Sequence, residues 1–216
     1  MLAFAAMLLT QCKDDGSSPL FDAIIAPQVS LNFTSENSTL EFDDIVTTDD
    51  SSNPTYIDLN HNFQKDPGEE IVANKQYQIN DKKVTLYGHI EAFQLTDQFK
   101  LVGVTVQSRY LKKLEVVDCR NLAEVQINKA NTLELIDLTG CNAVEKFELT
   151  TNGNFISALK EIRMGNPLVI TKEDFIKKFL NNLPKRNNDG KLYIDSTSFT
   201  TEMAKIIVEK GWELNP

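Results

Sequence analysis

The sequence predicts an α/β, β-rich fold in which a stack of short strands lies between an N-terminal β cap and a C-terminal β/α cap. Three observations lead to this prediction: a phased apolar repeat over residues 90–164, two cysteines separated by one repeat length, and helix and strand signals after residue 170. With 216 residues, of which 41% are hydrophobic, the chain can bury a substantial core. We therefore expect one elongated domain.

Residues 1–11 are predicted to be a secretory signal peptide. The apolar run from Leu2 to Thr10 is too short to span a membrane, and it leads directly into Cys12. The segment Leu9-Thr10-Gln11-Cys12 resembles a bacterial lipobox. This resemblance implies that Cys12 is lipidated and becomes the first residue of the mature protein. The alternative is an ordinary buried N-terminal segment.

A flexible acidic tether is expected over residues 12–37. Lys13-Asp14-Asp15 resembles the signal that sends lipoproteins of the Bacteroidetes to the outer face of the outer membrane. A lipid and a flexible linker would anchor the protein to the membrane without spanning it. We therefore expect an exported, surface-exposed lipoprotein of the outer membrane.

The net charge of −9 is concentrated near the N-terminus. Residues 13–70 contain 13 acids and two lysines, a balance of −11, whereas residues 71–216 contain 18 acids and 20 bases, a balance of +2. Nucleic acid requires clustered Lys and Arg, so the acidic front half argues against a nucleic-acid partner.

Residues 38–89 are predicted to form the N-terminal cap, which includes a candidate calcium loop. Counted from its first residue, oxygen ligands stand at positions 1, 3, 5, 7, 9 and 12 of a twelve-residue loop, with a backbone carbonyl at position 7. The residues are Asp58, Asn60, Asn62, Gln64, Asp66 and Glu69. This is the spacing of an EF-hand-type loop.

Position 6 of that loop is usually glycine, and here it is Phe63. We therefore expect weak binding of a structural Ca²⁺, with Kd on the order of 10⁻⁴ to 10⁻³ M. The alternative is an acidic, Asn-rich turn that matches the spacing by coincidence.

Residues 90–166 contain seven matches to the pattern L-x-x-L-x-L, whose starts are 11, 10, 11, 11, 11 and 15 residues apart. Apolar offsets of 3 and 5 share one face of a strand but not one face of a helix. Each unit therefore predicts a short strand. The matches start at Ile90, Leu101, Leu111, Leu122, Leu133, Val144 and Leu159.

Two units make about 22 residues, the length of one leucine-rich-repeat coil. Cys119 and Cys141 are 22 residues apart, and each follows the last strand residue by three, where such repeats place Asn or Cys. The sequence therefore predicts a short leucine-rich-repeat solenoid, whose coils must stack to bury their apolar sides. For the cysteines, buried thiols are the first interpretation, with a disulfide or a metal or catalytic pair as alternatives.

Residues 167–216 are predicted to be the C-terminal β/α cap. Thr171 and Asp174 resemble a capping box before an apolar helical face that ends at Leu183. A turn at 188–190, a strand at 191–195, a helix at 200–210 and a final strand at 212–214 are expected to follow.

Taken together, the chain resembles a family of Bacteroidetes surface leucine-rich-repeat lipoproteins that is related to internalin-like adhesins. The resemblance covers roughly residues 50–216 and runs through Tyr56-Ile57-Asp58-Leu59-Asn60, Asp66-Pro67-Gly68-Glu69, Val84-Thr85-Leu86-Tyr87-Gly88, Gly190-Lys191-Leu192-Tyr193-Ile194-Asp195 and Gly211-Trp212. It implies surface display and adhesion or recognition.

The expected function is non-catalytic recognition of a protein or glycan ligand at the cell surface by a monomer. No catalytic motif is recognisable in the sequence, so we do not expect an enzyme. The alternatives are an accessory subunit of an outer-membrane uptake complex for glycans or peptides and, third, a hydrolase. Contacts are expected on outward strand residues: Gln94, Lys113, Glu115, Val117, Leu135 and Asp137, with Thr105, Gln126 and Glu148 as a second series.

Overall fold

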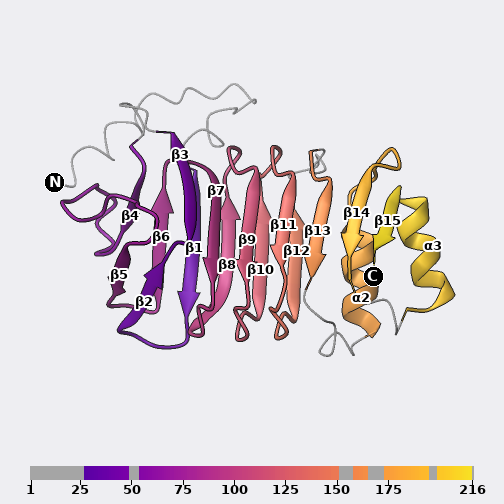
Figure 1. The fold of residues 1–216 in the computed structure, drawn as a ribbon, viewed down its shortest axis with the longest axis horizontal. Coiled ribbons are helices and arrows are strands. Elements are labelled where there is room, and N and C mark those ends of the chain that lie inside the picture. The colour runs from indigo at the N-terminus through magenta and orange to yellow at the C-terminus, as the bar shows by residue number, and fades with distance from the viewer. Residues whose placement is uncertain (1–26, 49–53, 151–157, 165–172, 195–198, 216) are drawn as a thin grey trace, which may run out of the picture.

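The computed structural model describes residues 27–48, 54–150, 158–164, 173–194 and 199–215 (Figure 1). In these ranges the chain is β-rich. Two large sheets share one apolar core, and a two-stranded sheet lies at the N-terminal end of the stack (Figure 1).

The six-stranded sheet has the strand order β12-β10-β8-β1-β6-β4. Its strands β8, β10 and β12 pair in parallel, whereas β1 pairs antiparallel with both β8 and β6, and β4 pairs antiparallel with β6. The strands are β1 (Gln28–Phe33), β4 (Tyr56–Asp58), β6 (Lys83–Tyr87), β8 (Leu101–Gln107), β10 (Glu124–Asn128) and β12 (Lys146–Thr150).

The seven-stranded sheet has the order β15-β14-β13-β11-β9-β7-β3. All of its neighbours pair in parallel except β3 and β7, which pair antiparallel. The strands are β3 (Asp44–Thr48), β7 (His89–Thr96), β9 (Lys113–Val117), β11 (Leu135–Leu138), β13 (Glu161–Met164), β14 (Gly190–Tyr193) and β15 (Trp212–Asn215). The small antiparallel sheet consists of β2 (Ser38–Glu41) and β5 (Gln76–Ile79).

Each of the seven repeat units contains one strand, from β7 to β13, which confirms the prediction made from the apolar spacing. Successive units alternate between the two large sheets, so a strand pairs with the strand two units later. Val104 of β8 is thus in register with Val125 of β10, and Phe93 of β7 with Leu114 of β9. All of these side chains are buried. The apolar offsets 3 and 5 point into the core because alternate strand residues share one face.

The prediction of a leucine-rich-repeat solenoid was wrong. The described chain is a β-sheet protein with three sheets, and the two large ones are mixed rather than purely parallel. The physical reason lies in the N-terminal third. It contributes β1, β4 and β6 to one large sheet and β3 to the other by antiparallel pairing, where we expected a tether and a separate cap.

The predicted tether, residues 12–37, was extended too far toward the C-terminus. Residues 28–33 form β1, an interior strand that is hydrogen-bonded to neighbours on both sides. Polar and apolar residues alternate along it, and Val29, Leu31 and Phe33 are buried in the core. A strand with one buried face and two paired edges cannot act as a flexible linker. The predicted signal peptide and Cys12 lie outside the described residues.

The elements predicted near the C-terminus are present as α2 (Glu173–Asn182), β14, α3 (Thr201–Glu209) and β15. The Thr200 side chain accepts a hydrogen bond from the Met203 amide and caps α3, while Gly211 with φ 75° follows its end. Helix α2 packs on β12, where the Phe147 and Phe179 rings meet edge to face at 5.3 Å.

Within the described ranges, no helix is both long and apolar enough to cross a membrane.

Candidate functional site

The candidate calcium loop begins at the end of β4, the edge strand of the six-stranded sheet. Asp58, its first residue, is the last residue of this strand and is 1% exposed. The loop closes at Glu69, which is 3% exposed and whose carbonyl accepts a hydrogen bond from the Ile57 amide at 2.9 Å. Both ends of the loop are therefore fixed to the sheet.

Carboxylates and amides at the predicted ligand positions fold the loop inward. The two Asp58 oxygens accept hydrogen bonds from the Asn62 amide at 3.1 Å and the Phe63 amide at 3.2 Å. Asp66 Oδ2 accepts from Asn60 Nδ2 at 2.7 Å and from Asn62 Nδ2 at 2.6 Å. Residues at positions 1, 3, 5 and 9 are thereby linked by hydrogen bonds within the loop.

The carboxylate of Glu69 joins the two ends of the loop. Its Oε1 accepts from the Leu59 amide at 2.9 Å, and its Oε2 accepts from the Asp66 amide at 2.9 Å. Beyond the loop, the Tyr77 hydroxyl donates to the Glu70 carbonyl at 2.6 Å and accepts from the Val72 amide at 2.7 Å. The chain is thus held on both sides of the last predicted ligand.

Phe63 replaces glycine at position 6 yet adopts the backbone conformation that glycine favours there. Its φ is 61°, in the left-handed region, and Gln64, at position 7, donates its amide to Asn62 Oδ1 at 2.8 Å. The curl of the loop is therefore formed without glycine, at the cost of backbone strain.

The donor set fits a hard cation because every predicted ligand atom is oxygen. Among the described residues, no three His, Cys, Asp or Glu side chains form a metal-holding group. The loop would thus depend on the amide oxygens of Asn60 and Asn62 as well as on its carboxylates. No Lys or Arg of the described chain pairs with Asp58, Asp66 or Glu69.

An aromatic cluster lies beside the loop. The rings of Tyr56 and Tyr87 stack with centroids 5.3 Å apart, and Phe63, which is 73% exposed, meets Tyr87 edge to face at 6.2 Å. Burial, together with the charge of Asp58, the nearby Tyr87 and the charge of Glu69, raises the pKa of Tyr56 to about 12. The Tyr56 hydroxyl therefore stays protonated at physiological pH.

The six outward residues predicted as a binding surface lie on adjacent strands of the seven-stranded sheet. Gln94, Glu115 and Asp137 are in register across β7, β9 and β11, and Lys113 pairs with Leu135 in the same way, while Val117 lies opposite Thr96. Asp137 is the most buried of them, and its Oδ2 lies 3.3 Å from Arg163 Nη1.

The second predicted series lies on the outer face of the six-stranded sheet. Thr105, Gln126 and Glu148 are in register across β8, β10 and β12. Ser30 of β1 and Thr85 of β6 continue the same row toward Asp58 of β4. This row therefore ends at the first residue of the calcium loop.

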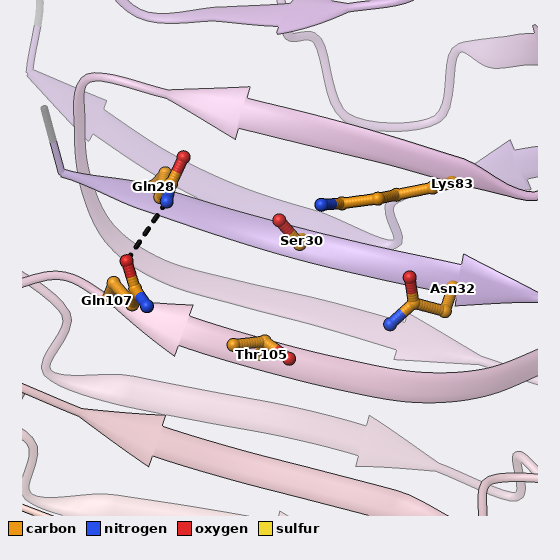
Figure 2. Close-up of a pocket in the computed structure, with 6 residues that line it drawn as sticks. All are labelled: Gln28, Ser30, Asn32, Lys83, Thr105 and Gln107. Carbon is orange, nitrogen blue, oxygen red and sulfur yellow. Dashed lines mark hydrogen bonds between the residues drawn. The ribbon is translucent and has the colours of Figure 1, made fainter. Parts of the chain in front are cut away.

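A polar hollow of about 140 Å³ lies on this outer face over β1 (Figure 2). Its lining residues are Gln28, Ser30, Asn32, Lys83, Thr105 and Gln107. Sequence reasoning identified only Thr105, because β1 had been assigned to the tether. The strict alternation of polar and apolar residues over 28–33 was the signal that could have identified Gln28, Ser30 and Asn32.

Cys119 and Cys141 are both buried with free thiols, and Cys141 Sγ donates to the Val116 carbonyl at 3.0 Å. The hydrogen bond with Cys119, together with burial, raises the pKa of the Cys141 thiol. These thiols occupy turn positions inside the stack, as the first interpretation of the sequence expected.

Comparison of the chain with family models, with curated proteins and with solved structures found no match. The function is therefore inferred from the chain's own geometry.

Proposed function

We propose that this protein is a non-catalytic recognition module, displayed at the cell surface through a lipid on Cys12, which binds a ligand on the outer face of its six-stranded sheet. One observation carries the proposal: the polar hollow over β1 lies on a face whose side chains stand in register across six strands. Paired strands hold such side chains in a fixed array, which reduces the entropy lost on binding.

The choice of face follows from its shape and polarity. Gln28 Nε2 donates to Gln107 Oε1 at 3.0 Å across β1 and β8, which orients both amides beside the hollow. On the seven-stranded sheet, Arg163 lies within ion-pair distance of Asp137 and Glu161, so these charges already satisfy one another. Ligand sites combine a concave shape with a few convergent polar groups, and this combination favours the six-stranded face.

The recognition proposal is tested by screening the full chain, made soluble by Cys12→Ala, against arrayed glycans and extracellular matrix proteins. Thr105→Arg places a bulky charge at the hollow, and Glu115→Arg places the same side chain on the opposite outer face. We expect at least one ligand, whose binding falls at least tenfold with Thr105→Arg and little with Glu115→Arg. The absence of any ligand, the reverse pattern, or hydrolysis of a screened polymer would contradict the proposal.

We also propose that residues 58–69 bind one structural Ca²⁺, with the residues predicted from the sequence as ligands. Support comes from the all-oxygen donor set and from three carboxylates in one loop, whose charges would offset that of a divalent cation. When bound, the ion would supply charge neutralisation and would crosslink the two ends of the loop. It would stabilise the edge of the sheet at β4 and would have no catalytic role.

Calorimetry and thermal unfolding test the calcium proposal. We expect a Kd on the order of 10⁻⁴ to 10⁻³ M and a melting temperature that rises with added Ca²⁺ and falls again with chelator. Asp66→Asn should weaken binding at least tenfold, because it removes a charge without changing side-chain size. Asp44→Asn, at an exposed position on β3 of the other large sheet, is the control. Calcium that produces neither heat nor a melting shift would overturn the proposal.

A further inference from the structure

The hollow over β1 exists because short side chains lie between long ones. Its lining includes Ser30 and Thr105, which are in register across β1 and β8, and the Ser30 hydroxyl lies 3.3 Å from the Thr85 hydroxyl on β6. Gly103, in register with Asn32, adds no side chain at one end. The hollow therefore follows from the residue sizes at paired strand positions.

Several polar groups at the hollow have no partner within the described chain. No hydrogen bond or ion pair joins the side chain of Asn32, Lys83 or Thr105 to another described residue. The hydrogen bond between Gln28 and Gln107 uses only one end of each amide, so the Gln28 carbonyl and the Gln107 NH₂ group can bind elsewhere. Figure 2 shows these side chains standing side by side on β1, β6 and β8.

Lys83 gives the hollow a single positive charge. The lining contains no carboxylate, and Figure 2 shows the Lys83 side chain extending toward Ser30. Elsewhere on the same face, Lys146 forms a short ion pair with Glu124 and lies 3.9 Å from Glu148. A lone ammonium group among neutral amides favours one negative group on the ligand, whereas the net charge of −9 disfavours a polyanion.

The aromatic cluster lies beside one of the residues that line the hollow. Tyr87 of β6 is the cross-strand partner of Gln28 of β1, and alternate strand positions place both side chains on the same outer face. Tyr56 stacks on Tyr87, and Phe63 extends the apolar surface outward. An aromatic face beside amides and hydroxyls matches a pyranose ring, whose C–H faces are apolar and whose edge carries hydroxyl groups.

We propose that this hollow binds a single carboxylate-bearing sugar residue, with its carboxylate on Lys83, its hydroxyls on the amides of Asn32, Gln28 and Gln107, and its ring beside Tyr87. The inference rests on the proposed recognition function and names the class of its ligand. Lys83 sets the preference for an acidic sugar, while the neutral groups provide the affinity that acidic and neutral sugars share.

Methyl β-D-glucuronide and methyl β-D-glucoside test the inference because they differ only in a carboxylate and a hydroxymethyl group. Each is titrated by NMR into the full chain carrying Cys12→Ala. We expect the glucuronide to bind at least tenfold more tightly than the glucoside. Lys83→Met should abolish this preference without weakening the binding of the glucoside, whereas Lys82→Met, at the neighbouring exposed lysine, should preserve it.

The outcomes separate this inference from the broader proposal. Equal binding of the two glycosides by the unsubstituted hollow, or a preference that survives Lys83→Met, would overturn the acidic-sugar site. If neither glycoside binds while the array screen still yields a ligand sensitive to Thr105→Arg, the sugar inference fails and the recognition function stands. If the array screen also yields no ligand, both the acidic-sugar inference and the recognition proposal fail. Thermal unfolding of each variant shows whether the fold is intact.

Discussion

Phe63 and Tyr87 meet edge to face at 6.2 Å, and this contact joins the curled loop to the outer face of the six-stranded sheet. Phe63 keeps the contact while its backbone stays in the left-handed region at φ 61°. The same residue therefore strains the candidate calcium site and extends the aromatic cluster. This dual position means that substitution of Phe63 should affect the two functions in opposite directions.

Phe63→Gly should strengthen calcium binding. A non-glycine residue in the left-handed region costs about 1 kcal/mol, and the part of this strain that Ca²⁺ binding imposes on the free loop corresponds to at most about a fivefold lower Kd when it is relieved. Calorimetry with Ca²⁺ measures the change. Asn37→Gly, at another residue with positive φ, controls for general effects of added glycine. An unchanged or higher Kd would show that loop strain does not limit the affinity.

Gly140→Ala should destabilise the stack strongly. Gly140 has φ 76°, and an added Cβ would lie 2.0 Å from Asp118 Oδ1 and 2.9 Å from the Asp118 Cα. Strain and clash together should lower the free energy of unfolding by roughly 2–4 kcal/mol in urea denaturation. Gly68→Ala has positive φ but no atom within 4 Å, so in the presence of chelator it should cost only about 1 kcal/mol. Equal losses of unfolding free energy in the Gly140→Ala and Gly68→Ala proteins would contradict the clash assigned to Gly140.

Glu91 should titrate below its ordinary range. Hydrogen bonds from Lys112 at 2.6 Å and Thr48 at 3.2 Å lower the pKa of its carboxyl group. A lowered pKa contributes stability above the unfolded-state pKa, and that contribution is lost as the pH falls through the folded-state value. Lys112→Met should raise the Glu91 pKa toward 4.5 in an NMR titration, whereas Lys113→Met should leave it nearly unchanged. A Glu91 pKa that does not respond to Lys112→Met would refute the pairing.

Cys12→Ala should release the protein from the membrane fraction. The lipid is expected on this thiol, so the substitution should remove both membrane association and incorporation of labelled fatty acid in the native host. Cys141→Ala should retain both properties, because the Cys141 thiol is buried. Membrane retention of the Cys12→Ala protein with no lipid label would place the anchor elsewhere.

The strands of the repeat could be predicted because apolar spacing reports local geometry. Leu114 and Val116 belong to one strand face, and their offsets distinguish a strand from a helix without knowledge of any partner. The overall fold could not be predicted in this way. Any coil of that length repeats every 22 residues, so the period does not identify the fold. It also does not specify which strands lie on the opposite side of the core.

Strand β1 and the pairing of the N-terminal strands with the repeat were missed because their partners are distant in the sequence. Gln28 pairs with Tyr87 on one side and with Gln107 on the other, and nothing in residues 27–37 alone indicates these partners. The acidic, Ser-rich segment before β1 favoured a tether, although the alternation from Gln28 to Phe33 was typical of a half-buried strand. The hollow depends on these cross-strand neighbours and was missed for the same reason.

The loop was predictable to a greater extent because its ligand spacing is local. Asp58, Asn62 and Asp66 interact within one turn of chain, so the sequence interval determines which side chains meet. The left-handed conformation of Phe63 could not be read from the sequence, because phenylalanine rarely adopts it.

The position of β1 also determines the order in which the chain can fold. Its hydrogen bonds to β8 connect residues up to 79 positions apart, so this ladder cannot form until Gln107 is available. Closing so long a segment costs more entropy than the pairing of adjacent repeat units, and long-range pairing slows folding. We therefore expect β8, β10 and β12 to associate before β1 inserts between β8 and β6.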